Sequence, residues 1–585
     1  MLPLVLHRFL HRSWRLGCFK RSGTLSTAYL SRNFATTRIT KLSIRQESTQ
    51  TSNTFLAGSL KIGIRPFLKG YWAGIDQKLD VPKLPWNQPS LLDAASRKRN
   101  SRPSACRHFS SSSLIPGRER YWQKIPQWEN VTTEEFTSYR WQLKFSVVGD
   151  NKLKRFLAEA LPEKLPSSSD PRLAHIATRE LFIQDVEAGV TAAPMAIRLT
   201  PYILSSINWG SPLDDPVRKQ FIPLRSSLLP DHEALTLDSL HEEHDSPVPG
   251  LVHRYPDKAL FLVTSICPVY CRFCTRSYAV GAPTETLDKK KHQKPSRRRW
   301  EVVFQYIEST PTLQDIVVSG GDTYFLQPED ITEIGERLLS IPHVKRFRFA
   351  SKGLSVLPGR VTDTNDRWFS TFIDLSNRGR REGKHICLHT HFNHPNEITW
   401  ITREAARHLF SNGVIVRNQS VLLRGVNDTV ETMGTLIREL SDMNIRPYYV
   451  YQCDLVRGIE DLRTPLSTIL ELEQQLRGTI AGFMMPSFVV DLPGGGGKRL
   501  ACSYHKYENG TSHFRAPGLL GEKGEREYKY FDPVTTNHVQ QVQRHDSVCR
   551  ENARSQSAGL VPDTDGPMAG NDEELIEPLA AAHGS

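Results

Sequence analysis

Six short β-rich runs alternate with helical patterns over residues 259–480. The runs are ALFLVTS (259–265), DIVVS (315–319), KRFRFAS (345–351), HICLHTH (385–391), VIVRNQSVLL (414–423) and IRPYYVYQ (445–452). Strands joined by helical crossovers pair in parallel. Six repeats are too few for a closed eight-stranded barrel. We therefore predict an α/β fold built on a partial (β/α)6 barrel, with its chemistry at the carboxyl ends of the strands.

Composition divides the remaining chain. Residues 1–120 hold 21 Lys and Arg against 5 Asp and Glu, whereas the other 465 residues hold 54 against 58. We predict a leader and disordered basic region (1–120), a helical N-terminal domain (121–250), the barrel (251–480), a C-terminal segment (481–545) and a disordered acidic tail (546–585). The basic run KKKHQKPSRRR (289–299) is interpreted as a solvated loop insertion, with an acidic partner surface as the alternative.

The leader resembles a targeting segment. Residues 1–46 contain nine Lys and Arg and no acidic residue, as in a mitochondrial transit peptide, which predicts a matrix location. A disordered basic tail is the alternative. Because the positive charge lies in the leader, the main argument for nucleic-acid binding is removed, and we expect no nucleic-acid partner. No run of about 18 apolar residues predicts a transmembrane helix.

Three of the nine cysteines lie in CPVYCRFC (267–274), directly after the first predicted strand. Disulfides, zinc and an iron–sulfur centre all use clustered cysteines. Nine cysteines in 585 residues do not form a disulfide framework, and structural zinc usually needs a second cysteine pair. Three thiolates can hold a [4Fe–4S] cluster and leave one iron open.

The sequence FVVDLPGGGGK (488–498) carries a second candidate group. It is not a phosphate-binding P-loop, because Leu492 and Arg499 break the required pattern. Four glycines give a mobile backbone that can bring Lys498 to a planar partner, and lysine forms Schiff bases with pyridoxal phosphate. A flexible surface loop is the alternative.

Two levels of resemblance follow from these motifs. CPVYCRFC, with SGGD (319–322) closing the second strand, resembles the signature of radical S-adenosylmethionine enzymes, in which the open iron binds S-adenosylmethionine. The order and spacing of seven motifs resemble the lysine 2,3-aminomutase family from about Trp141 to Lys498. The motifs are HRYPDK (253–258), CPVYCRFCTR (267–276), SGGD (319–322), THFNHPNEIT (390–399), NQSVLLRGVND (418–428), PYYVYQCDL (447–455) and FVVDLPGGGGK (488–498).

The resemblance implies roles for particular residues. Cys267, Cys271 and Cys274 would ligate the [4Fe–4S] cluster. Gly320, Gly321 and Asp322 would contact S-adenosylmethionine. Lys498 would carry pyridoxal phosphate, with Arg254 and Tyr451 lining its pocket and Lys258 standing where relatives often have a second arginine. Arg276 would bind the α-carboxylate of the substrate, and Asp454 and Asp491 its ε-ammonium. Helix capping by Asp454 and a turn at Asp491 are the alternatives for these two carboxylates.

The implied activity is that of an isomerase that interconverts L-lysine and β-lysine after hydrogen abstraction by a 5′-deoxyadenosyl radical. An electron donor of ferredoxin or flavodoxin type and a homo-oligomer are the expected partners. Another amino acid substrate, or lysine modification for a translation factor, is the alternative function. Bacterial relatives carry a C-terminal zinc-binding cysteine cluster, but this chain has only Cys502 and Cys549 after Lys498, so we expect no zinc. The spacing of His389, His391 and His394 fits packing and cofactor contacts better than a metal site.

Overall fold

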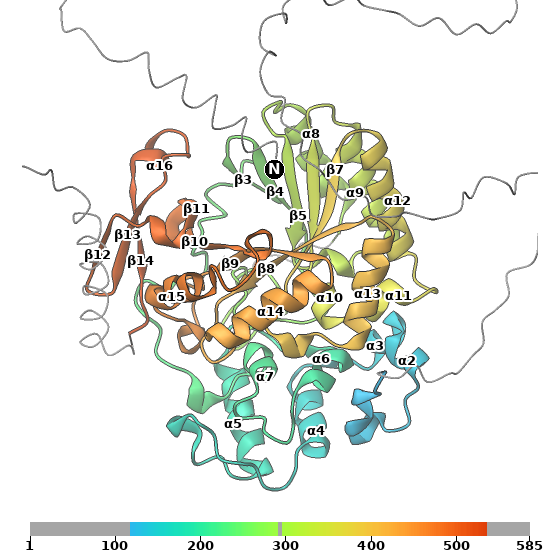
Figure 1. The fold of residues 1–585 in the computed structure, drawn as a ribbon, viewed down its shortest axis with the longest axis vertical. Helices are drawn as coiled ribbons and strands as arrows, with labels where there is room; N and C mark the ends of the chain where they lie inside the picture. The colour runs from blue at the N-terminus through green and yellow to red at the C-terminus, as the bar shows by residue number, and fades with distance from the viewer. Residues whose placement is uncertain (1–117, 290–294, 535–585) are drawn as a thin grey trace, which may run out of the picture. The chain divides into compact units, whose positions relative to one another are not determined.

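The computed structural model describes residues 118–289 and 295–534, which belong to one compact unit (Figure 1). The predicted leader up to residue 117, the centre of the basic run and the predicted acidic tail lie outside the described residues. The last three residues of the basic run begin a helix, so the run is not wholly a loop.

A nine-stranded sheet in the order β11-β10-β9-β8-β7-β6-β5-β4-β3 organises the fold. Six of its strands are the six predicted ones, and neighbouring members all pair in parallel, which confirms the partial barrel. These strands are β4 (Lys258–Thr264), β5 (Asp315–Gly320), β6 (Arg346–Ala350), β7 (His385–Thr390), β8 (Ile415–Val421) and β9 (Ile445–Tyr451).

Three further strands extend this sheet. β3 (Leu251–Tyr255) pairs antiparallel with β4, β10 (Ser487–Leu492) pairs parallel with β9, and β11 (Gly497–Leu500) pairs antiparallel with β10. The sheet therefore continues past residue 480, where we had expected the barrel to end. The strand β11 carries the glycine-rich lysine into the sheet.

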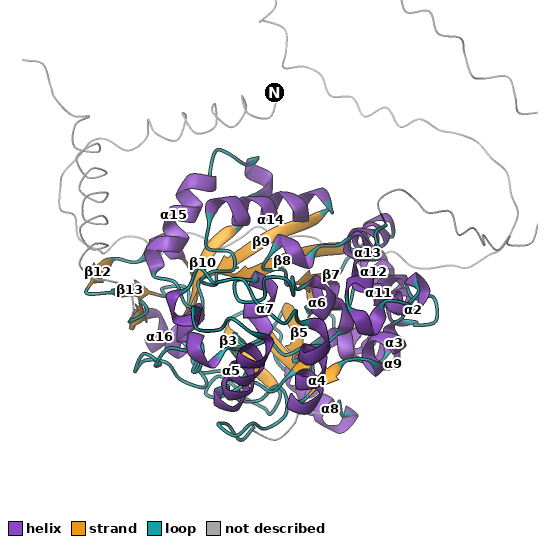
Figure 2. Cartoon of the chain, turned by 90° about the horizontal axis from the view of Figure 1, so that it is seen from below, coloured by secondary structure: helices purple, strands orange, loops and turns teal. Residues whose placement is uncertain are grey.

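Helices connect the strands and cover the outer face of the sheet (Figure 2). They are α8 (Arg297–Glu308), α9 (Pro328–Ser340), α10 (Gly353–Val356), α11 (Gly359–Thr362), α12 (Trp368–Arg381), α13 (Trp400–Ser411), α14 (Val430–Asp442) and α15 (Leu466–Leu476). In α14 the Thr429 side chain accepts a hydrogen bond from the Thr432 amide at the amino end. Apolar residues at helical spacing then bury one face, here Met433, Leu436 and Leu440.

The helical N-terminal region packs into the same core as the barrel. Its elements are α2 (Thr133–Thr137), α3 (Tyr139–Lys144), β1 (Val147–Val148), α4 (Asp150–Ala160), α5 (Arg179–Ala192), β2 (Arg198–Leu199), α6 (Pro201–Ser206) and α7 (Pro216–Phe221). One continuous apolar cluster joins Trp122 and Phe182 of this region to Phe261 and Trp300 of the barrel. Because a shared core fixes the two parts, the N-terminal region can hold loops of the barrel in place.

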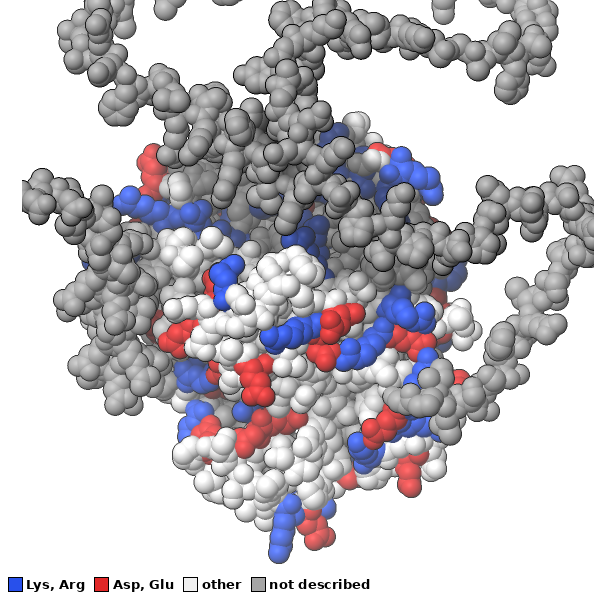
Figure 3. Space-filling view, in the orientation of Figure 1, with Lys and Arg blue, Asp and Glu red and all other residues white. Residues whose placement is uncertain are grey.

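After the sheet, the chain forms a separate three-stranded antiparallel sheet of β12 (Lys506–Glu508), β13 (Thr511–Arg515) and β14 (Glu527–Phe531), with the short helix α16 (Glu522–Glu525). In the described part of the chain, no helix has the length and apolar character needed to cross a membrane. On the face drawn in Figure 3, basic and acidic side chains are interspersed.

Candidate active site

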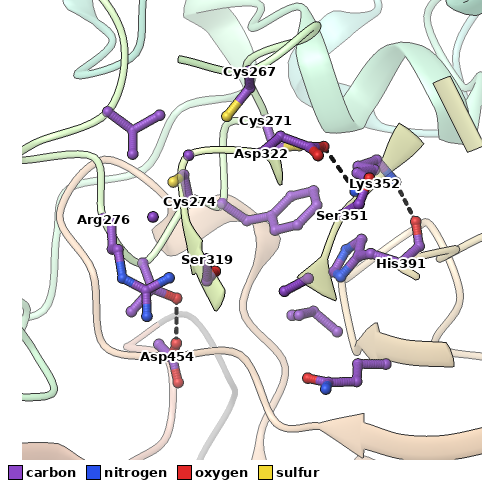
Figure 4. A pocket seen from close by; sticks show the side chains of 18 of the residues that line it. Cys267, Cys271, Cys274, Arg276, Ser319, Asp322, Ser351, Lys352, His391 and Asp454 are labelled. Atoms are coloured by element: carbon purple, nitrogen blue, oxygen red, sulfur yellow. Dashed lines mark hydrogen bonds between the residues drawn. The ribbon is translucent and has the colours of Figure 1, made fainter. Parts of the chain in front are cut away.

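The three clustered cysteines follow β4 and line one cavity of about 310 Å³. All three are partly exposed and free of disulfides. In Figure 4 they gather at the opposite end of the cavity from Asp454. The cavity thus presents three sulfur donors to a common space.

The cysteine loop is anchored on two sides. The amides of Tyr270 and Arg272 donate to Arg198 O (3.1 Å) and Gln220 O (3.0 Å) in the N-terminal region. The buried Arg272 guanidinium binds both oxygens of Asp461 at 2.9 and 3.0 Å. These anchors fix the backbone that carries the thiols.

Burial disfavours the thiolate form of all three cysteines. It raises the pKa of Cys271 to about 12 and raises the pKa of Cys267 and Cys274 as well. A bound metal centre would offset this cost, since its positive charge favours thiolates. The donor set therefore fits an iron–sulfur cluster.

The turn after β5 packs directly beneath the cysteine loop. Gly320 has φ +112°, and a Cβ there would lie 2.2 Å from Thr264 O, while one at Gly321 would lie 2.6 Å from Ile266 N. Both glycines are thus required by close backbone packing. Asp322 accepts hydrogen bonds from the Tyr324 and Lys352 amides, each at 2.8 Å. All three line the cavity, and their contact with S-adenosylmethionine stays a prediction.

Lys498 and Asp491 meet at the other end of the cavity. They are cross-strand partners on β11 and β10, and Lys498 Nζ lies 2.5 Å from Asp491 Oδ2. Burial opposes the charge of Lys498, but the neighbouring Asp491 carboxylate raises its pKa well above the usual value. The glycines form a tight turn, with Gly494 at φ +72°, and Lys498 stands on a strand. The expected mobility of this backbone stays a prediction.

A second compartment of about 240 Å³ continues from the first. The two share Lys498, Asp491, Tyr451, Arg276, Gln419 and His389 in their walls. The second adds cationic and aromatic groups suited to a planar anion: Arg254, Lys258, Arg348, Tyr255, Tyr448 and Tyr449. Lys258 Nζ lies 4.0 Å from the Tyr255 ring centroid, and the Lys498 amide donates to Tyr255 Oη at 3.0 Å. Aromatic faces and fixed cations beside a lysine amine fit pyridoxal phosphate.

Asp454 follows β9 and lies in the wall of the first compartment. Thr275 Oγ1 donates to Asp454 Oδ2 at 2.6 Å. Burial, together with the nearby charge of Asp491, raises the pKa of Asp454 to about 7. Two carboxylates at one site repel unless a cation lies between them, so this end of the cavity favours an ammonium group.

The guanidinium of Arg276 reaches both compartments. The sequence indicated it as a carboxylate-binding group, but in the structure its Nε and Nη2 already bind Glu242 at 2.8 and 2.6 Å. The sequence did not indicate Glu242, Thr275 or Tyr255 as site residues. Glu242 and Thr275 gain their relevance from contacts to residues at least 34 positions away, which no local pattern reveals.

The three candidate histidines have different surroundings. His389 Nδ1 forms a hydrogen bond with the Gln419 side-chain amide at 2.7 Å. His391 stacks on Phe273, and His394 caps a short helical turn. Burial lowers the pKa of His389 to about 3, and its Nε2 is buried without a hydrogen-bond partner. Neutral His389 therefore offers an unsatisfied ring nitrogen to a ligand in either compartment.

Within residues 118–289 and 295–534, no three His, Cys, Asp or Glu side chains are arranged to hold a metal ion. Thiolates of a [4Fe–4S] cluster each bind a different iron, so the sulfurs need not converge as ligands of a single ion do.

No family model matches the chain. It is 38% identical over 373 residues to the L-lysine 2,3-aminomutase of Clostridium subterminale, a match that covers 63% of this chain and 79% of the relative. The L-lysine 2,3-aminomutase of Bacillus subtilis is 36% identical over 387 residues, with 65% and 72% covered. The glutamate 2,3-aminomutase of Clostridioides difficile is 29% identical over 391 residues, with 67% and 82% covered.

Proposed function

We propose that this chain, which belongs to the lysine 2,3-aminomutase family, is a radical S-adenosylmethionine and pyridoxal phosphate enzyme that interconverts L-lysine and β-lysine. One observation carries the proposal. The three cysteines, the Lys498 amine and the Asp454 and Asp491 carboxylates all line a single cavity. Each group is of a type that the reaction needs, and a common cavity lets them act on one substrate.

Separate groups of residues would hold the two cofactors. Cys267, Cys271 and Cys274 would hold the cluster, while Arg254 and Lys258 would hold the phosphate of the second cofactor. When bound, the cluster with S-adenosylmethionine supplies a carbon radical, and pyridoxal phosphate supplies a carbonyl that carries the migrating amino group. Lys498 must lose a proton to solvent before its amine can attack a carbonyl, and the Asp491 carboxylate, with Oδ2 at 2.5 Å, favours the protonated amine until then.

The carboxylates support lysine as the substrate. Two cations lie beside Asp491, Lys498 Nζ at 2.5 Å and Arg254 Nη1 at 4.0 Å, and once Lys498 reacts Asp491 would lose the nearer one. The ε-ammonium of lysine can take that place between Asp491 and Asp454. A glutamate side chain would bring a third negative charge to the same site, so the pair argues against an acidic substrate.

The experiment is an anaerobic assay of the reconstituted protein with both cofactors, reductant and L-lysine. We expect β-lysine from the wild type and none from Lys498→Ala at unchanged iron content. If the wild type cleaves S-adenosylmethionine but forms no β-lysine, the lysine assignment is refuted, and the radical chemistry is retained for another amino acid or a protein-bound lysine.

We further propose that the enzyme acts in the mitochondrial matrix, receives electrons from a ferredoxin- or flavodoxin-type donor and assembles with copies of itself. The basic segment of residues 1–46, which has no acidic residue, supports the location. A fluorescent protein fused behind residues 1–120 should enter mitochondria. A diffuse cytosolic signal would refute the location.

A further inference from the structure

A short loop, residues 238–246, places acidic side chains beside both compartments. Its Glu242 is only 4% exposed, and Glu242 and Leu240 lie in the wall of the second compartment. Asp238 fixes the loop by accepting hydrogen bonds from the Glu242 and Glu243 amides at 2.9 and 3.1 Å. The backbone that carries Glu242 is therefore held in place locally.

Glu242 binds one edge of the Arg276 guanidinium. Its two oxygens accept from Nε at 2.8 Å and Nη2 at 2.6 Å, which is the bidentate geometry of a strong arginine–carboxylate pair. Tyr278 Oη donates to the same carboxylate at 3.2 Å. Arg276 is thereby fixed in one orientation, with its Nη1 and the outer side of Nη2 left to bind another acceptor.

The same loop also holds Arg254 of the second compartment. Asp245 accepts from Arg254 Nε at 2.7 Å, and it also binds Lys523 of α16. The Gly494 amide of the glycine-rich turn donates to Ser239 O at 2.8 Å. One loop thus contacts Arg254, Arg276 and the turn that precedes Lys498.

We propose that Glu242 is a positioning residue that aims Arg276 at the α-carboxylate of the substrate and so makes the enzyme select amino acids over amines and amides. The inference rests on the proposed function. The ion pair with Glu242 leaves Arg276 no excess positive charge to attract anions, so recognition of the carboxylate depends on where the remaining donors point. Lysine and arginine side chains lose much rotamer freedom when fixed, and Glu242 removes that freedom before the substrate arrives.

The test compares binding of L-lysine with binding of L-lysinamide, which keeps both amino groups and lacks the carboxylate. Dissociation constants are measured by calorimetry on the cofactor-loaded protein without reductant, so that no turnover occurs. The wild type should bind L-lysine more tightly. In Glu242→Gln the preference for L-lysine should fall about tenfold, the value of one charged hydrogen bond.

Three controls make the outcome specific. Glu243→Gln changes the same charge at the exposed neighbouring position and should leave the preference unchanged. In an Arg276→Gln background, Glu242→Gln should have no further effect, because the residue that it positions is gone. Thermal unfolding and iron content of each variant establish that it is folded and loaded.

A folded Glu242→Gln variant with the wild-type preference would refute the positioning role. An increased preference would also refute it, since Glu242 would then merely compete with the substrate for Arg276. If the wild type itself shows no preference for L-lysine over L-lysinamide, the carboxylate role of Arg276 and the proposed substrate fail instead.

Discussion

Asp491 and Lys498 face one another across the β10–β11 hairpin, and their side chains form an ion pair with 2.5 Å between Oδ2 and Nζ. The pair joins a group proposed to bind the substrate to the group proposed to bind the cofactor. The charge state of one therefore depends on the other.

Replacing Asp491 should make Lys498 react with pyridoxal phosphate at lower pH. The Asp491 charge raises the pKa of Lys498, so Asp491→Asn lowers it and exposes the free amine earlier as pH rises. The pH dependence of Schiff-base formation, followed by absorbance, should move to lower pH. Asp454→Asn is the control and should move it less, because Asp454 makes no ion pair with Lys498. An identical profile in Asp491→Asn and wild type would contradict the coupling.

Binding of L-lysine should weaken as pH falls through about 7. Burial and Asp491 raise the pKa of Asp454 to about 7, and a protonated carboxyl group cannot pair with the ε-ammonium. Well below this pH the affinity should fall by about tenfold per pH unit. Calorimetric titrations from about one pH unit below that pKa to about one unit above it measure the dissociation constant of L-lysine. The Asp454→Asn variant should bind L-lysine weakly and without this pH dependence. If the variant keeps the pH dependence, another group is responsible for it.

Removal of the Thr275 hydroxyl should raise the pH at which L-lysine binding weakens. The hydrogen bond from Thr275 to Asp454 favours the carboxylate and holds the pKa of Asp454 lower than burial alone would. In Thr275→Val, L-lysine binding should therefore begin to weaken at a higher pH than in the wild type. Thr284→Val, a threonine of the same β4–α8 connection without contact to Asp454, should leave the profile unchanged. Coinciding profiles for Thr275→Val and wild type would contradict the prediction.

Alanine at Gly320 should damage the cysteine loop. Its Cβ would lie 2.2 Å from Thr264 O, so the β5 turn must move away from the residues that precede Cys267. We expect a loss of at least about 3 kcal/mol of stability and a lower iron content after reconstitution.

Gly383→Ala is the matched control for this substitution. Gly383 also has positive φ, at +71°, but a Cβ there meets nothing within 4 Å. It should cost only about 1 kcal/mol, from backbone conformation alone, and leave iron binding intact. Equal thermal shifts for the two variants would show that contact with Thr264 is unimportant.

Local patterns were sufficient for the repeating part of the fold. The six strands β4 to β9 and the helices between them follow from hydrophobic runs and helical periodicity, because each run must bury its apolar side against a neighbour. Strands β10 and β11 were not expected as members of the sheet. Their glycine-rich connection has the local pattern of a loop, and they become strands through the pairing of β10 with β9 and of β11 with β10.

The sequence by itself determined which chemical groups this protein has: three cysteines after the first barrel strand, a glycine-preceded lysine and two aspartates. Motif spacing carries that information because each motif is local. Only the tertiary structure decided how the groups are paired. Strand register places Lys498 opposite Asp491, Thr275 donates a hydrogen bond to Asp454, and Glu242 accepts hydrogen bonds from Arg276. The last two contacts join residues at least 34 positions apart. The charges of all these groups depend on burial, which exists only in the folded protein.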